Sequence, residues 1–190
     1  MSEHTAAIIW QRANADFLNG RYSRAHQWVF DGGVAVPASS SPQVVPEPYS
    51  IGANVDPEEA FVASIASCHM LWFLSFAMKA RFIVDRYEDS AVGTMATNED
   101  GRLWVATVTL LPRVSYSDGR GPSLNEEDAL HHAAHDACFI ANSVRTKIVV
   151  QSALYREGMA AYKEGNRIYH NAMHKLSDLL FIDVLALLKT

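Results

Sequence analysis

Hydrophobic and polar residues alternate near the N-terminus, over residues 21–30 (RYSRAHQWVF). This alternation is typical of a half-buried β-strand and puts Arg24, His26 and Trp28 on one face. The DGG sequence at 31–33 predicts a hairpin turn into a second strand at 34–37. A longer hairpin is predicted over 83–97 and 103–116, where β-branched and aromatic residues alternate on both sides of NEDG.

A long apolar helix is predicted between these two hairpins. The DPEE sequence at 56–59 supplies an Asp N-cap, a Pro at the first helical position and a Glu for a capping box, and the helix then runs to about Arg81. Residues 60–78 carry no formal charge, which is close to the length of a membrane span. Because this run contains several serines and a histidine and has charged residues at both ends, we expect the buried central helix of a soluble domain and no membrane partner.

The remaining segments complete an α+β pattern. A second helix is predicted over 125–142 and a last strand over 147–154, while the proline-rich segment 38–55 reads as a long loop. We interpret residues 1–20 as a peripheral N-terminal arm, with a short helix over 6–17, and residues 21–157 as one domain. Residues 158–190 form a predicted helical C-terminal extension, whose role the sequence leaves open.

Charge and cysteine content exclude several classes of protein. Lys and Arg total 16 against 21 Asp and Glu, a net charge of −5, which disfavours a nucleic-acid partner. The first residues do not show the pattern of a secretory signal, so we expect a cytoplasmic protein. Two cysteines 70 residues apart are too few for a secreted disulfide scaffold. The sequence contains neither a serine-nucleophile elbow nor a glycine-rich phosphate loop, and we expect no cofactor.

The two cysteines are the residues on which chemistry could depend. Cys68 and Cys138 are each predicted in a helix among apolar neighbours, where inert core cysteines are also found. A reactive thiolate in the middle of a helix needs a nearby cation, and the first strand offers Arg21, Arg24 or His26.

Histidines near each cysteine raise two further questions. His131, His135 and Cys138 share one face of the second predicted helix, so a metal-binding protein is an alternative, although a fourth ligand would have to come from elsewhere. His69 follows Cys68 directly but points about 100° away around the helix. For His69 we expect a buried, hydrogen-bonded side chain.

Two motifs together carry a specific resemblance. NVDPEEAFVASIASCHM at 54–70 and AHDACFIANSV at 134–144 occur in the order and context of the OsmC/Ohr family of thiol-dependent peroxidases, which the chain resembles from about residue 21 to residue 154. The resemblance implies antiparallel sheets wrapped around central Cys-bearing helices in an intertwined, obligate homodimer. It also implies that the active sites lie at the subunit interface.

The same resemblance implies the reaction and its residues. Cys68 would reduce an organic hydroperoxide to an alcohol and become a sulfenic acid, which Cys138 would resolve as a disulfide. Glu58 matches the carboxylate that orients a catalytic arginine, and no metal takes part. The electron donor would be a dithiol, such as a lipoylated protein.

The arginine does not follow directly from the family pattern, because segment 38–55 contains none. Arg24 is our choice because it shares a strand face with His26, and Arg21 is the alternative. A straight helix would separate Glu58 from Cys68 by about 15 Å, so we expect a kink near 63–67 or an approach by groups of the partner chain.

Two expectations concern substrate and activity. We expect an apolar pocket lined by aromatic and apolar residues of the long helix and the first strand: Phe61, Met70, Trp72, Phe73 and Trp28. The alternative to a peroxidase is an OsmC-fold stress-response or small-ligand binding protein without efficient peroxidase activity, which the missing loop arginine suggests.

Overall fold

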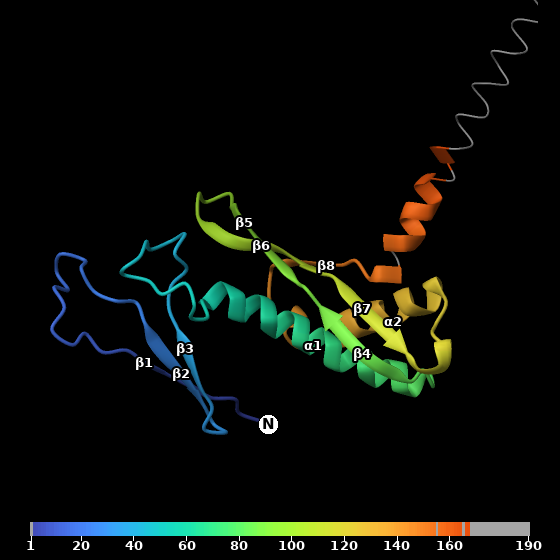
Figure 1. Ribbon diagram of the computed structural model, residues 1–190, viewed down its shortest axis with the longest axis horizontal. Helices are drawn as coiled ribbons and strands as arrows, with labels where there is room; N and C mark the ends of the chain where they lie inside the picture. The colour runs from blue at the N-terminus through green and yellow to red at the C-terminus, as the bar shows by residue number, and fades with distance from the viewer. Residues whose placement is uncertain (1, 155, 165, 168–190) are drawn as a thin grey trace, which may run out of the picture. The chain divides into compact units, whose positions relative to one another are not determined.

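The computed structural model describes every residue except 1, 155, 165 and 168–190, and it shows a mixed α+β fold (Figure 1). This confirms the predicted class. The regular elements, in chain order, are β1 (Ala6–Ile9), β2 (His26–Phe30), β3 (Ala35–Ala38), α1 (Pro57–Lys79), β4 (Val84–Asp89), β5 (Val92–Thr97), β6 (Leu103–Leu110), β7 (Pro112–Tyr116), the 3-10 turn η1 (Ser117–Gly119), α2 (Leu124–Ala137), the 3-10 turn η2 (Ala141–Ser143) and β8 (Lys147–Val150).

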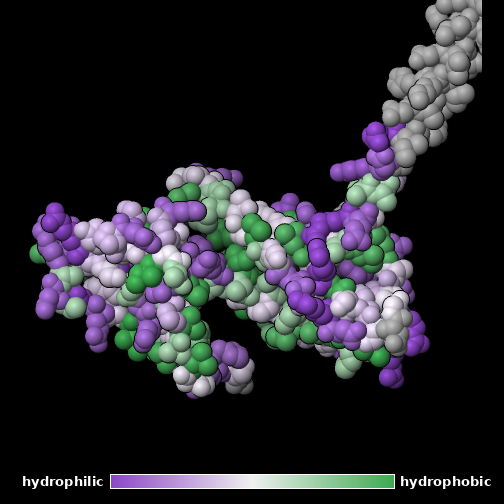
Figure 2. Space-filling model, in the orientation of Figure 1, coloured by the Kyte–Doolittle hydropathy of each residue, from purple (hydrophilic) through white to green (hydrophobic). Residues whose placement is uncertain are grey.

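The first sheet consists of β1, β2 and β3 in that order, with both pairs antiparallel. The β2–β3 hairpin confirms the turn predicted at 31–33, but β2 begins at His26 instead of residue 21. The helix expected over 6–17 is wrong: residues 6–9 form β1, because their backbone groups pair with β2 in a register that sets Ile8 opposite Trp28. Hydrophobic side chains are exposed over this sheet (Figure 2).

The two strands predicted over 83–97 and 103–116 are each divided in the structure. Their outer halves form an antiparallel β4–β7 sheet, and their inner halves join β8 in a sheet ordered β5-β6-β8. At the break between β6 and β7, the backbone N–H of Leu111 donates to Asp89 Oδ1 at 2.7 Å. The Asp89 carboxylate thus accepts the hydrogen bond that a neighbouring strand would otherwise accept, at the point where the chain passes from one sheet to the next.

Helix α1 begins as predicted and continues without a break. The backbone N–H of Glu59 donates to Asp56 Oδ1 at 2.7 Å, and the N–H of Asp56 donates back to Glu59 Oε2 at 3.1 Å, which completes the capping box. The kink predicted near 63–67 is wrong, since α1 is continuous from Pro57 to Lys79. It contains neither an internal proline nor a glycine to bend it.

Only one stripe of α1 is buried within a single chain. Ile65, His69, Phe73 and Ala77 are fully buried and follow one another at intervals of four residues, while Leu71 and Met78 are 63% and 64% exposed. The helix is long and apolar enough to cross a membrane by length and composition, which is weak evidence because the core helices of soluble proteins share these properties. The expectation of a buried central helix is therefore met on one face only.

Helix α2 is shorter than predicted and excludes the second cysteine. Its N-terminus is fixed by a capping box between Ser123 and Glu126, and its last residue is Ala137. Cys138 is the C-cap in an extended conformation, so the expectation that this helix carries Cys138 within it is wrong by one residue. A 3-10 turn, η2, follows in place of the helical residues expected up to 142.

Contacts divide the chain into two compact units. Among the described residues, the first contains those up to 68, 91–108 and 139–148, and the second contains 69–90, 109–138 and those from 149 to 167. Phe73 and Ala77 of α1 pack with Leu130 and Ala134 of α2 in the core of the second unit. Residues 158–164, 166 and 167 of the predicted extension are helical, and the rest of 158–190 lies outside the described residues.

Candidate functional site

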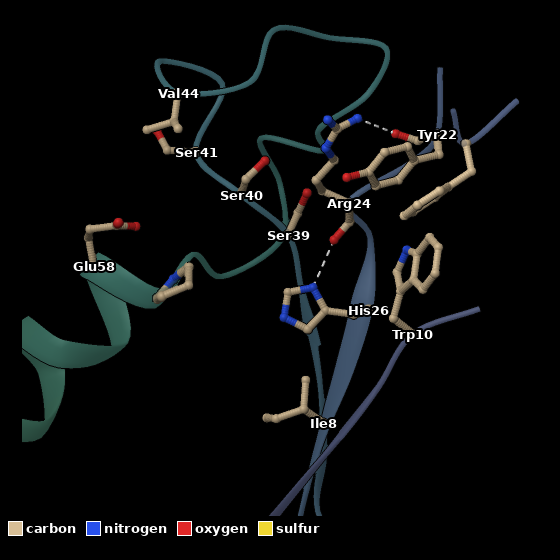
Figure 3. Close-up of a pocket in the computed structure, with 12 residues that line it drawn as sticks. Ile8, Trp10, Tyr22, Arg24, His26, Ser39, Ser40, Ser41, Val44 and Glu58 are labelled. Atoms are coloured by element: carbon tan, nitrogen blue, oxygen red, sulfur yellow. Dashed lines mark hydrogen bonds between the residues drawn. The ribbon is translucent and has the colours of Figure 1, made fainter. Parts of the chain in front are cut away.

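A pocket of about 480 Å³ lies in the first unit, beside the N-terminal turn of α1 (Figure 3). The arm, the segment before β2, the loop after β3 and the helix start all contribute to it. Its lining combines apolar and aromatic side chains with a few polar ones: Ile8, Trp10, Phe17, Tyr22, Arg24, His26, Ser39, Ser40, Ser41, Val44, Pro57 and Glu58.

Arg24 is half-buried in this pocket and lies just before β2, not within a strand as predicted. Its Nη1 donates to the carbonyl oxygens of Tyr22 at 2.6 Å and Gly20 at 3.1 Å, and its guanidinium lies 3.8 Å from the centre of the Tyr22 ring. These contacts fix the guanidinium without neutralising its charge. Arg21 is not among the lining residues, and its backbone pairs with Asp16 instead.

His26 holds the backbone at Arg24. The Trp28 indole N–H can only donate, and it donates to His26 Nε2 at 2.9 Å. His26 Nε2 is therefore the acceptor, so the proton lies on Nδ1, which donates to the Arg24 carbonyl oxygen at 2.8 Å. The sequence predicted that Arg24, His26 and Trp28 share a strand face. In the structure, hydrogen bonds link the Trp28 indole to the His26 ring and the His26 ring to the Arg24 carbonyl.

Glu58 lies on the opposite side of this pocket from Arg24, with Ser39 and Ser40 between them in the view of Figure 3. The capping box of α1 uses Glu59, so the Glu58 carboxylate is not needed to cap the helix. The described residues show no ion pair between Arg24 and Glu58. The structure thus brings this predicted pair into one pocket and leaves space between them.

Cys68 is half-buried in α1 and is not among the lining residues of the pocket. It follows Glu58 by ten residues of unbroken helix, a distance of about 15 Å along the axis. Within the described chain, no hydrogen bond or ion pair joins Cys68 to an arginine. Cys138, fully buried, belongs to the second unit, where its backbone N–H donates to the His135 carbonyl oxygen at 3.2 Å.

The apolar lining of this pocket differs from the prediction. None of the five residues expected there, which are Phe61, Met70, Trp72, Phe73 and Trp28, lines it. Phe73 is a core residue of the second unit, and Trp72 packs against that core. The arm instead supplies Trp10 and Phe17, whose rings contact Tyr22. The sequence signal for this pocket-lining role was the presence of Trp10 and Phe17 in an arm whose other residues show no regular apolar pattern.

A second polar cluster is buried in the other unit. His69 Nε2 lies 3.0 Å from His131 Nδ1, which confirms the expectation of a buried, hydrogen-bonded His69. His131 Nε2 lies 3.8 Å from Glu127 Oε1, and the Tyr116 hydroxyl donates to Glu127 Oε2 at 3.3 Å. Sequence reasoning missed Glu127 and Tyr116, because only the packing of α2 on α1 and β7 brings them to the histidines.

Burial and neighbours determine the protonation of this cluster. Burial, with the neighbouring His131 and His135, lowers the pKa of His69 to about 3, so its imidazole is neutral near pH 7. Burial alone would raise the pKa of Glu127, but the polar groups of His131, Ser152 and Tyr116 bring it below its usual value. In the described part of the chain, no group of three or more His, Cys, Asp or Glu side chains is arranged for a metal ion, so the metal-binding alternative gains no support.

Comparison with known proteins gives a consistent result for the fold. The OsmC-like protein family model matches residues 51–153. An OsmC-like protein of unknown function from Vibrio cholerae is 51% identical, covers 80% of this chain and 99% of its own, and superposes with a TM-score of 0.77. No curated protein matches the chain.

More distant structures share the fold alone. An organic hydroperoxide resistance protein from Elizabethkingia anophelis is 17% identical, with 80% of this chain and 94% of that chain covered and a TM-score of 0.59. The organic hydroperoxide resistance protein OhrB of Bacillus subtilis is 18% identical, with 80% and 96% covered and a TM-score of 0.55. The family model and the 51% identity together establish that the chain belongs to the OsmC-like family.

Proposed function

We propose that the protein reduces organic hydroperoxides to alcohols, with Cys68 as the attacking thiol and Cys138 as the resolving thiol. The observation that carries the proposal is the pocket where a fixed, unneutralised Arg24 and Glu58 lie among apolar walls. Such a pocket suits a substrate that has an apolar body and a polar peroxide group. Membership of a family that includes organic hydroperoxide resistance proteins supports the same reaction.

The reaction consists of two displacements. The Cys68 thiolate attacks the outer peroxide oxygen, the O–O bond breaks, and the alkoxide leaves and takes up a proton to become the alcohol. Cys68 is thereby oxidised to a sulfenic acid. The Cys138 thiolate then attacks the Cys68 sulfur, the S–O bond breaks, and hydroxide leaves as water after gaining a proton. Two thiols and one hydroperoxide thus give one disulfide, one alcohol and one water.

The site is completed by a second chain in this proposal. In one chain, the unbroken α1 keeps Cys68 about 15 Å from Glu58, too far for a shared arginine. The exposed apolar side chains of α1, such as Leu71 and Met78, are suited to packing against a second copy. We therefore assign Arg24 and Glu58 of the partner subunit to each Cys68, in the intertwined homodimer that the family resemblance implies.

Arg24 has two tasks in such a site. Its positive charge favours the thiolate form of the attacking cysteine and stabilises the negative charge that develops on the leaving oxygen. Glu58 would orient the guanidinium once substrate and the partner chain are in place. The Tyr22 and Gly20 carbonyls fix the arginine beforehand, so little reorganisation is needed at the moment of reaction.

The proposed reaction requires an electron donor, and the proposal also covers the location and partners of the protein. The Cys68–Cys138 disulfide must be reduced by a dithiol, for which a lipoylated protein is the reductant we propose. We propose a cytoplasmic protein without a nucleic-acid or membrane partner, and the acidic net charge of −5 supports the proposal as far as nucleic acid is concerned.

The test is oxidation of the reduced protein by one equivalent of cumene hydroperoxide, with hydrogen peroxide in parallel. We expect rapid loss of both thiols and an intramolecular Cys68–Cys138 disulfide, detected by mass. Cys68→Ser should block the reaction, and Cys138→Ser should divert it to sulfinic and sulfonic acids.

A binding or stress-response protein without efficient peroxidase activity is the second candidate. The separation of Cys68 from Arg24 and Glu58 within one chain favours it if no partner completes the site. Slow oxidation of both thiols, without preference for the organic hydroperoxide, would support this candidate and contradict the peroxidase.

A further inference from the structure

Two buried histidines join the segments that carry the two cysteines. His69 is 1% exposed and directly follows Cys68 in α1, and His131 is 3% exposed in α2. Their ring nitrogens, His69 Nε2 and His131 Nδ1, form a hydrogen bond of 3.0 Å. One ring donates and the other accepts, so the bond needs both imidazoles in matching tautomers.

His131 is held at two successive turns of α1. Besides its bond to His69, its ring stacks on Phe73, with centroids 4.4 Å apart, and Phe73 lies one helical turn beyond His69 and is fully buried. Glu127, one turn earlier in α2, places a carboxylate oxygen 3.8 Å from the far nitrogen of His131. These contacts make His131 a fixed attachment point of α2 on α1.

The attachment point has a defined relation to Cys138. Cys138 follows His131 by seven positions, about two turns or 10 Å along the axis, and lies where α2 ends. Cys138 is the C-cap of α2 and is fully buried. A rotation or shift of α2 around His131 would therefore displace Cys138 directly.

We propose that His69 and His131 are positioning residues for disulfide formation, and that their hydrogen bond holds the α2 terminus where Cys138 can attack the oxidised Cys68. The inference rests on the proposed function and adds a role to residues that do not touch substrate. It concerns the second displacement alone, in which the Cys138–Cys68 bond forms and hydroxide leaves. Attack of Cys68 on the hydroperoxide does not depend on this bond.

Amide variants can keep or remove the bond with little other change. An Asn side chain places its polar atoms near the position of Nδ1, and a Gln side chain places them near that of Nε2. His131→Asn and His69→Gln therefore retain the bond, whereas His131→Gln and His69→Asn misplace it. His132→Gln is the matched control, since His132 is the next residue and its side chain is 74% exposed.

The measurement separates the two displacements after addition of cumene hydroperoxide. Sulfenic acid is trapped with dimedone, and the disulfide is followed by quenched mass analysis. We expect all variants to form the sulfenic acid within about twofold of the unmodified rate, and His131→Gln and His69→Asn to close the disulfide about tenfold more slowly. His131→Asn and His69→Gln should close it several-fold faster than their misplaced counterparts.

Equal closure rates for the paired amides, or an equal slowing of both displacements, would overturn the proposal. Diamide, which takes two electrons and two protons from a dithiol, closes the disulfide without any hydroperoxide. If cumene hydroperoxide fails on the unmodified protein while the amide pairs still differ with diamide, the proposed function fails and the positioning role stands. If any variant does not fold, as judged by near-ultraviolet circular dichroism, the remaining pair decides.

Discussion

Two polar clusters of this protein differ in almost every physical respect. Arg24 and Glu58 are half-buried at an open pocket and make no ion pair with each other among the described contacts. His69, His131 and Glu127 are buried in the second unit, where His69 and His131 share a hydrogen bond, Tyr116 donates to Glu127, and Glu127 lies 3.8 Å from His131. One cluster keeps its charges available, and the other uses its polar atoms for packing.

This difference predicts that substitutions in the pocket affect activity more than stability, and that substitutions in the buried cluster affect stability. A charge at a solvated pocket costs the folded state little and can act on a substrate, so its removal should lower activity far more than stability. A buried polar group left without its partner retains a large desolvation cost, so its removal should destabilise the fold.

The largest effect is expected for Arg24→Met. Loss of the guanidinium should lower the rate of hydroperoxide-dependent oxidation by about 10²- to 10³-fold, because Arg24 is the one Lys or Arg among the described residues that line the pocket. The free energy of unfolding, measured by urea titration, should change by less than about 1 kcal/mol. Arg21→Met is the control, and a rate loss equal to that of Arg24→Met would remove the distinction between the two arginines.

A large effect of the opposite kind is expected for Glu127→Ala. It leaves Tyr116 and His131 without their buried carboxylate, which should lower the free energy of unfolding by about 3 kcal/mol. Asp128→Ala, at the exposed neighbouring position, should change it by less than about 1 kcal/mol. Similar losses for the two variants in urea unfolding would show that the buried cluster does not stabilise the fold.

The pH dependence of stability should come from the buried cluster. In the native protein, His69 becomes protonated only as the pH falls to its pKa of about 3. In the unfolded chain, a histidine becomes protonated as the pH falls below about 6.5. Between these values the unfolded state binds more protons, so stability falls as the pH falls, by about 2 kcal/mol from pH 6.5 to pH 5. His69→Gln, which does not titrate, should flatten this slope in urea titrations, and an unchanged slope would assign it to other groups.

The smallest effect is expected at the helix caps, which belong to neither cluster. Ser123→Ala removes the side-chain acceptor for the Glu126 N–H in the capping box of α2 and should cost about 1 kcal/mol in unfolding free energy. Ser123→Thr keeps a hydroxyl that accepts from the Glu126 N–H and donates to the Glu126 carboxylate, so it should retain most of the stability. A loss as large as that of Glu127→Ala would contradict the ranking.

Local features of this fold were predictable from the sequence, and contacts between distant segments were not. DPEE predicted the α1 capping box because the bonds lie within four residues, and the DGG turn predicted the β2–β3 hairpin. The division of the long strands depends on Asp89 reaching Leu111, 22 residues away. Strand β1 exists because β2 offers it an edge, which residues 6–9 alone do not reveal.

The candidate site divides in the same way. The motifs predicted Cys68, Cys138 and Glu58 as site residues, and the strand pattern favoured Arg24 over Arg21. Arg24 and Glu58 line the pocket, whereas Arg21 and Cys68 do not. The expected kink was a way to bring Glu58 to Cys68 in one chain, and α1 does not have it. The His69–His131 bond spans 62 residues and becomes visible only once α1 and α2 are packed.

The central claim, that each Cys68 works with Arg24 of a partner subunit, is tested most directly by complementation. Cys68→Ser and Arg24→Met proteins are each expected to be inactive alone. In a mixed dimer, the intact Cys68 of one chain meets the intact Arg24 of the other. Random mixing of equal amounts should therefore restore about one quarter of the unmodified activity, since half of the dimers are mixed and each has one intact site.

The mixture is made by joint refolding, and the exchange of chains is verified by native mass spectrometry before hydroperoxide is added. Activity near one quarter of that of the unmodified protein, with mixed dimers present, is the result that the account predicts. Mixed dimers without restored activity would contradict it, because they would show that Arg24 serves the cysteine of its own chain or serves none.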